Sequence, residues 1–130
     1  MKALKTRFVT VAAVVALCAG SSLALAGLVR TDPVTITLSG GTYTAVGSLN
    51  SARYSSDTTQ DMGCLTDSSG LAECWAQDAT GRYVACTSTS SAFVHAAASV
   101  GSATNLNFQF PSTSGTCKYL AVSNDSGNLH

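Results

Sequence analysis

Two short turn motifs and four cysteines constrain this chain more than any other feature of its sequence. The motifs, Asp67-Ser68-Ser69-Gly70 and Asp78-Ala79-Thr80-Gly81, share the pattern D-x-x-G. This pattern favours a type I turn followed by a left-handed glycine, which closes a β-hairpin. Two hairpins in succession predict an antiparallel meander of three strands. Each turn also determines which residues lie opposite each other in the neighbouring strands.

The turns align three of the cysteines in one row. Counting outward from the turns pairs Cys64 with Cys74 and Cys74 with Cys86. Cys64 and Cys86 are then about 10 Å apart, whereas a disulfide needs Cα atoms within about 7 Å. If the turn-closing residues are hydrogen-bonded pairs, Cys64 and Cys74 form a non-hydrogen-bonded pair, whose closer side chains suit a disulfide. We therefore predict Cys64–Cys74 and Cys86–Cys117, with Cys74–Cys86 and Cys64–Cys117 as the alternative.

The spacing of these cysteines favours disulfides over a metal site. Ligands of a structural zinc ion come in close pairs, whereas the gaps between these cysteines hold 9, 11 and 30 residues. An even number of cysteines in a short exported chain is typical of disulfides. The chain also has no phosphate-binding, dinucleotide-binding, EF-hand or H-E-x-x-H motif. We predict neither a metal site nor a cofactor.

The first 26 residues have the pattern of a secretory signal peptide. Three basic residues stand in the first seven positions, followed by an uncharged apolar run at 8–19 and the small-x-small site Ala24-Leu25-Ala26. This run is too short for an ordinary transmembrane helix, although an uncleaved membrane anchor is the alternative. Lipidation at Cys18 is disfavoured because the large Leu17 precedes it. We expect residues 27–130 to form a single exported domain.

The charge of residues 27–130 limits the partners of that domain. Four basic and seven acidic residues give it a net charge of −3. Nucleic acids and anionic membranes both require a basic surface, so the charge argues against both. No later apolar stretch approaches ~18 residues, so we expect no membrane span after signal cleavage. The short basic segment and alanine-rich apolar run look bacterial, and we expect a periplasmic or secreted protein.

Apolar alternation predicts strands on both sides of the meander. Residues 34–38 alternate apolar side chains with threonines, and two glycines turn this strand towards 43–46. A short helix capped by Ser90 or Ser91 extends to Val100, and strands follow at 105–110 and 117–122, before a frayed tail. The segment from Ser48 to Asp61 has no clear period. The predicted fold class is α+β: a mainly antiparallel sheet with one short helix, stapled by two disulfides.

The predicted register also divides the meander into two faces. One is small and apolar and suits contact with a helix; it comprises Met62, Cys64, Ala72, Cys74, Ala76, Val84 and Cys86. The opposite face carries Leu65, Glu73, Trp75, Gln77, Tyr83 and Ala85. Trp75 and Tyr83 are diagonal neighbours there, so they are candidates for stacking on sugar rings or anchoring a partner protein. The competing interpretation is that the strand at 34–38 packs over this face, because its apolar side chains need a surface to cover.

Two further residues are candidates for chemistry. Arg53 is able to bind an anionic ligand, although a surface ion pair with Asp57 or Asp61 competes with that role. His95 lies on the predicted helix, where a structural histidine is the simpler interpretation. A hydrolase would need it beside a serine or aspartate, and no G-x-S-x-G motif supports one.

A longer pattern connects the cysteines with the residues around them. It comprises Ala52-Arg53-Tyr54-Ser55, Gly63-Cys64, Cys74-x-Ala76-x-Asp78-Ala79-x-Gly81, Cys86 and Cys117. This pattern, over about residues 50–123, resembles a group of small exported bacterial proteins with four cysteines. The resemblance implies export and disulfides. It implies no activity and no site residues, because the group has no established activity.

These features predict an exported, non-catalytic binding or structural module of the bacterial envelope or extracellular space. Its partner would be an envelope protein or a glycan, and its candidate binding residues are Trp75, Tyr83 and Arg53. One alternative is a small secreted hydrolase or hydrolase-like effector that uses His95. Another is an inhibitor of an extracellular enzyme, since small stapled domains often serve that way.

Overall fold

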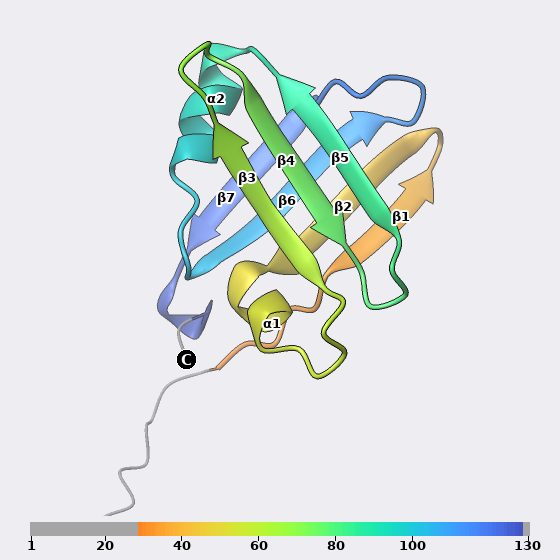
Figure 1. Ribbon diagram of the computed structural model, residues 1–130, viewed down its shortest axis with the longest axis vertical. Coiled ribbons are helices and arrows are strands. Elements are labelled where there is room, and N and C mark those ends of the chain that lie inside the picture. The colour runs from red at the N-terminus through yellow and green to blue at the C-terminus, as the bar shows by residue number, and fades with distance from the viewer. Residues whose placement is uncertain (1–28, 129–130) are drawn as a thin grey trace, which may run out of the picture.

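The meander predicted from the two turn motifs forms the front sheet of the molecule in Figure 1, a computed structural model that describes residues 29–128. Its strands are β3 (Asp61–Thr66), β4 (Ala72–Gln77) and β5 (Tyr83–Ser88), all antiparallel. In each turn the aspartate carboxylate accepts hydrogen bonds from two backbone N–H groups, at 2.8 and 3.1 Å for Asp67. Gly70 and Gly81 have φ of 81° and 84°, as the motif requires. The predicted signal peptide lies outside the described residues.

The register and the disulfides are those predicted. Cys64 lies opposite Cys74, and Cys74 lies opposite Cys86. The disulfides join Cys64 to Cys74, with Cα atoms 4.1 Å apart, and Cys86 to Cys117, with Cα atoms 5.1 Å apart. The first bond lies within the sheet. The second connects β5 to the segment that precedes β7, so it ties the two sheets of the protein together.

The remaining strands form a second antiparallel sheet, which the sequence did not distinguish from the first. Its order is β1-β2-β6-β7, and the strands are β1 (Thr35–Ser39), β2 (Thr42–Ser48), β6 (Thr104–Pro111) and β7 (Tyr119–Asn124). Gly40 and Gly41 join β1 to β2 in a two-residue turn and both have positive φ, which matches the twist of a hairpin. The predicted strands at 34–38, 43–46, 105–110 and 117–122 all correspond to these elements.

The core lies between the two sheets, whose strands cross in Figure 1. The inner face of β3–β5 contributes mainly small buried side chains: Ala72, Cys74, Ala76 and Cys86. The inner face of the second sheet contributes large ones: Ile36, Leu106, Phe108 and Phe110. Large side chains facing small ones fill the space between two layers without voids. This complementarity explains why the small face of the meander is buried.

The predicted helix is α2 (Ser91–Ala98), which begins after Ser90 and packs against β3, β4 and β7. Phe93 and Ala97 form its buried side. The fold class, α+β with mainly antiparallel sheet, one short helix and two disulfides, is confirmed. No helix within residues 29–128 is long and apolar enough to cross a membrane.

Two smaller elements were not expected. The helix α1 (Leu49–Arg53) lies in the segment without a clear period, and Ser48 Oγ caps it by accepting a hydrogen bond from Ser51 N–H at 3.2 Å. The 3₁₀ helix η1 (Ser126–Asn128) lies in the part of the tail that was expected to fray. That expectation is wrong, because Asn128 is buried and its carbonyl oxygen accepts a hydrogen bond from Asn50.

Candidate functional site

The outer surface of β3–β5 carries the aromatic residues identified from the sequence. We call it the Trp75 face and define it by the residues on the side of the strands opposite the core: Asp61, Gly63, Leu65, Glu73, Trp75, Gln77, Tyr83 and Ala85. It is the side of these strands turned toward the viewer in Figure 1, and no described element lies in front of it. Tyr83 and Leu65 are 56% and 44% exposed. The face is therefore open to solvent.

The interpretation that the strand at 34–38 covers this face is wrong. That strand, β1, pairs with β2 in the other sheet, and its Ile36 is buried in the core between the sheets. Its apolar side thus covers the inner face of the meander, where small side chains leave room for it. Arg82, which follows the second turn, donates a hydrogen bond from Nη1 to the Ile36 carbonyl oxygen at 3.2 Å. β1 therefore meets the meander near this turn and not across the Trp75 face.

The indole of Trp75 packs on the neighbouring strand β3. Trp75 stands opposite Gly63, and a Cβ atom at Gly63 would lie 2.8–3.3 Å from three atoms of the six-membered ring of the indole. The indole therefore occupies the space that a side chain at Gly63 would fill. Its Nε1 donates a hydrogen bond to Asp61 Oδ2 at 2.8 Å, which orients the ring along β3. The side chain as a whole is half-buried.

Carboxylates flank the two aromatic residues. Tyr83 lies diagonally from Trp75, because it stands opposite Gln77 while Trp75 stands opposite Ala85. Burial raises the pKa of Tyr83, and the negative charges of Glu73 and Asp61 raise it further. The Trp75 face as defined contains neither lysine nor arginine. Its potential is negative, which disfavours anionic ligands and suits neutral ligands that donate hydrogen bonds.

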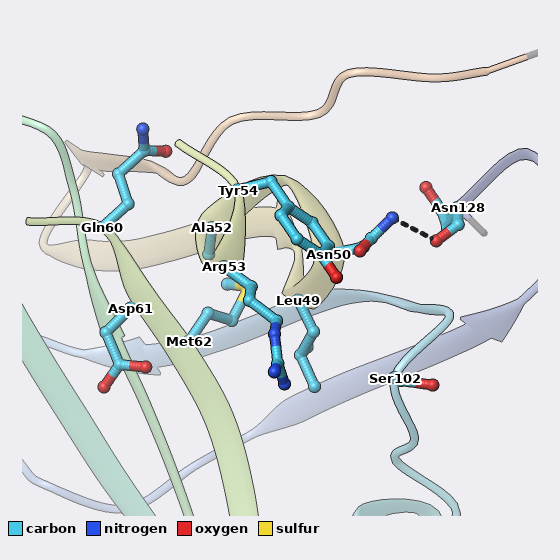
Figure 2. Close-up of a pocket in the computed structure, with 10 residues that line it drawn as sticks. All are labelled: Leu49, Asn50, Ala52, Arg53, Tyr54, Gln60, Asp61, Met62, Ser102 and Asn128. Atoms are coloured by element: carbon cyan, nitrogen blue, oxygen red, sulfur yellow. Dashed lines mark hydrogen bonds between the residues drawn. The ribbon is translucent and has the colours of Figure 1, made fainter. Parts of the chain in front are cut away.

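A cavity opens beside the Trp75 face, where β3 begins (Figure 2). We call it the α1 cavity, because residues of α1 line it together with the start of β3 and Asn128 of η1. Its volume is about 460 Å³, which is within the range of small-molecule sites. Asp61 lines the cavity and also holds the indole of Trp75. The cavity and the Trp75 face are therefore adjacent parts of one surface.

Arg53 lies at this cavity and does not form the ion pair that the sequence suggested. Asp57 instead accepts hydrogen bonds from its own loop, including one from Gln60 Nε2 at 2.6 Å, and Asp61 accepts the bond from Trp75. Within residues 29–128, no carboxylate is ion-paired with the Arg53 guanidinium. The guanidinium carbon lies 5.9 Å from the centre of the Tyr54 ring. The structure thus places Arg53 at a cavity that Asp61 also lines, and Asp61 belongs to the Trp75 face.

The surroundings of His95 bear on the hydrolase alternative. It is exposed on α2, and no serine, aspartate or glutamate of the described chain is hydrogen-bonded to it. Nor do residues 29–128 contain a group of three or more His, Cys, Asp or Glu side chains that could hold a metal ion. The described residues around His95 therefore supply no observation in favour of the hydrolase alternative.

Sequence reasoning missed Gly63 and Asp61 as parts of the site. The signal for Gly63 was present, because the predicted register already places a glycine opposite the only tryptophan. The α1 cavity had no such signal, since α1 is too short to display a helical period. Asn50, which lines this cavity, was missed for the same reason.

Comparisons of the chain with protein-family models, with curated proteins and with solved structures find no match. The function is therefore inferred from the geometry of the Trp75 face and the α1 cavity.

Proposed function

We propose that this protein is an exported, non-catalytic module that binds a glycan on the Trp75 face. The observation that carries the proposal is the indole of Trp75, spread over Gly63 on an open sheet and fixed by Asp61. A sugar ring has C–H groups on its faces and hydroxyl groups around its edge. It can stack on an aromatic ring while its hydroxyls donate hydrogen bonds to nearby carboxylates. Trp75, Asp61 and Glu73 offer this combination.

The rest of the Trp75 face supports a neutral glycan. Ala85 stands beside Trp75 on β5, so no large side chain blocks the approach of a ring from that direction. Tyr83 adds an aromatic ring that is itself exposed, one diagonal step away from Trp75. Export is supported by the signal-like segment at 1–26 and by the two disulfides, which persist in oxidising compartments.

The proposal is tested with a panel of soluble neutral oligosaccharides of different linkage and composition. Trp75 is the only tryptophan, so its emission reports directly on ligand binding. We expect at least one oligosaccharide to bind, and Trp75→Ala to weaken that binding about thirtyfold, measured by titration calorimetry. Tyr119→Ala is the control, because Tyr119 is an exposed aromatic residue that lies on the other sheet. The proposal fails if no oligosaccharide binds, or if the two variants weaken binding equally.

A further inference from the structure

We infer that the α1 cavity binds the acetamido group of an N-acetylated amino sugar. The inference rests on the proposed glycan-binding function and names the class of glycan that the surface takes. Three observations support it: a free hydrogen-bond acceptor on Asn50, a cationic donor on Arg53, and an apolar floor between them.

The acceptor is the side-chain oxygen of Asn50. This residue is only 8% exposed, and its Nδ2 donates a hydrogen bond to the carbonyl oxygen of Asn128 at 2.7 Å. A carbonyl oxygen can only accept, so this bond fixes the orientation of the Asn50 amide and leaves Oδ1 as the second polar atom. Figure 2 shows Oδ1 on the side of Tyr54 and Arg53. Within residues 29–128, no donor is hydrogen-bonded to this atom. A ligand N–H group would satisfy it.

The donor is the guanidinium of Arg53, one helical turn after Asn50 on the same side of α1. It forms no ion pair with a described carboxylate, so its N–H groups remain available to a ligand. In Figure 2 the side chain extends from α1 between Met62 and Leu49. Leu49, Met62 and Ala52 supply the apolar lining of the cavity. A carbonyl oxygen would meet the guanidinium here, and a methyl group would meet the apolar side chains.

A secondary acetamide combines the three groups that the cavity lining can bind: a donor, an acceptor and an apolar group. Its N–H fits Asn50 Oδ1, its carbonyl oxygen fits Arg53, and the methyl group of an acetamide fits the apolar floor. A carboxylate would also pair with Arg53, but it would leave Asn50 Oδ1 without a donor and would meet the negative charge of Asp61. An acceptor that a ligand shields from solvent without giving it a donor is unfavourable, so the neutral amide suits the cavity better.

The position of the cavity favours a sugar as the carrier of this amide. Asp61 lines the cavity and also holds the indole of Trp75. A glycan with one ring stacked on Trp75 would therefore bring an acetamido substituent to the cavity. The volume of about 460 Å³ accommodates an acetamido group together with the ring that carries it. A peptide amide would use the cavity without the aromatic ring, and the experiment separates these two sources.

The experiment compares three trisaccharides that differ only in one substituent. Chitotriose in its N-acetylated form carries acetamido groups, its deacetylated form carries amines, and cellotriose carries hydroxyls at the same position. N-acetyl-alanine methylamide supplies the amide without a sugar. We expect the N-acetylated trisaccharide to bind wild-type protein at least tenfold more tightly than any of the other three, as measured by titration calorimetry.

Two variants locate the selectivity in the cavity. Arg53→Met removes the donors but keeps an apolar chain, and we expect it to abolish most of the preference for the N-acetylated trisaccharide over cellotriose. Lys118→Met is the matched control: it removes one exposed positive charge from a residue outside the cavity, and we expect the preference to persist. Thermal melts of both variants verify that they fold.

The remaining outcomes overturn the inference in distinguishable ways. If cellotriose and the N-acetylated trisaccharide bind equally and Trp75→Ala weakens both, glycan binding stands but the acetamido assignment fails. Tighter binding of the deacetylated form would assign recognition to the carboxylates. Equal binding of the alanine amide would assign the cavity to a peptide. If no saccharide binds, the glycan proposal and this inference both fail.

Discussion

The two sheets of this protein are held in place by different forces. The meander of β3–β5 has its turns closed by aspartates, its register visible in the sequence, and one disulfide within it. Its inner face is built mainly from alanine and cysteine. The sheet of β1, β2, β6 and β7 has no disulfide of its own, and it supplies the large core residues Leu106, Phe108 and Phe110.

The difference shows that the two sheets of a small domain can be stabilised by different interactions. Small side chains remove little apolar surface from water, so the meander gains less from burial than the second sheet does. Its local restraints compensate: turn hydrogen bonds limit the conformations of the loops, and the disulfide limits those of the unfolded chain. The meander therefore does not need to bury its outer face for stability, and the candidate ligand surface lies on that face.

The largest expected effect comes from reducing both disulfides. Loop entropy predicts that the Cys86–Cys117 bond, with a sequence separation of 31, contributes about 4 kcal/mol, and that Cys64–Cys74, with a separation of 10, contributes about 3 kcal/mol. Domains of this size are typically stable by about 5–15 kcal/mol, so the reduced protein should be marginal. Thermal melts with and without reductant measure the loss.

Paired alanine variants then test the comparison between the two bonds. Cys86→Ala with Cys117→Ala should lower the melting temperature more than Cys64→Ala with Cys74→Ala, because it opens the longer loop and unties the sheets from each other. Hydrogen exchange on the fully reduced protein should become fast in β3–β5 before β2 and β6. Equal melting temperatures with and without reductant would show that the disulfides do not stabilise the meander.

The second prediction addresses the other sheet. Phe108 is fully buried in β6, and Phe108→Ala should cost about 3–5 kcal/mol, because it removes a large side chain and leaves a cavity. Thr37→Ala, on the exposed side of β1, is the control and should stay within about 0.5 kcal/mol of wild type. Urea unfolding of the oxidised proteins provides both values. A loss below about 1 kcal/mol for Phe108→Ala would mean that the second sheet is not the main source of apolar stabilisation.

The contrast between the sheets also explains what was predictable. The meander, its register and its disulfides followed from local rules, because a D-x-x-G turn determines the pairing of every residue after it. The strands of the second sheet followed from alternation, but their order did not. β2 pairs with β6 across more than fifty intervening residues, and no local pattern encodes such a contact.

The candidate site was predictable to the same extent. Trp75 and Tyr83 lie on the face that the register assigned to them, since alternation along a strand is a local property. Arg53 was identified as a candidate binding residue, but its place in the α1 cavity was not. That cavity depends on η1 meeting α1 and β3, and η1 lies far from both in the chain. The exposure of the Trp75 face depended on where β1 packs, which sequence alone left open.

The third prediction concerns the loop that joins the two sheets. Asp57 accepts a hydrogen bond from Gln60 Nε2, and Gln60 Oε1 in turn accepts one from the Val34 N–H at 2.7 Å, just before β1. The bond from the Gln60 side chain, followed by those from the Thr59 and Gln60 backbone N–H groups, lowers the Asp57 pKa from 3.8 to about 2. Because the folded-state pKa is depressed, this stabilisation is present above about pH 4 and is lost as the pH falls through about 2.

Asp57→Asn should therefore unfold more easily at neutral pH and depend less on pH between about 4 and 2. Urea midpoints at pH 7, 4 and 2 measure both effects. Asp67→Asn is the comparison inside the meander: hydrogen bonds from Ser69 and the turn backbone also lower the Asp67 pKa, but they close only a local turn. A pH dependence of Asp57→Asn identical to that of wild type would show that this network does not join the sheets.

The smallest effect on stability, and the sharpest test of the Trp75 face, is expected from Gly63→Ala. The new methyl group would take the position now covered by the indole, only 2.8 Å from its nearest ring atom. The indole is the far end of its side chain, so we expect it to lift from β3 and lose the hydrogen bond to Asp61. Replacing glycine within a strand restricts the unfolded chain, which offsets the lost contact and keeps the net change within about 1 kcal/mol. Tryptophan emission should shift to the red and glycan affinity should fall.

Ala85→Ser, on the opposite side of Trp75, should change neither the emission nor the affinity, because the indole lies over β3. A loss above about 2 kcal/mol for Gly63→Ala, with unchanged emission, would mean that the ring is a fixed part of the core and that both sheets are held by buried side chains alike.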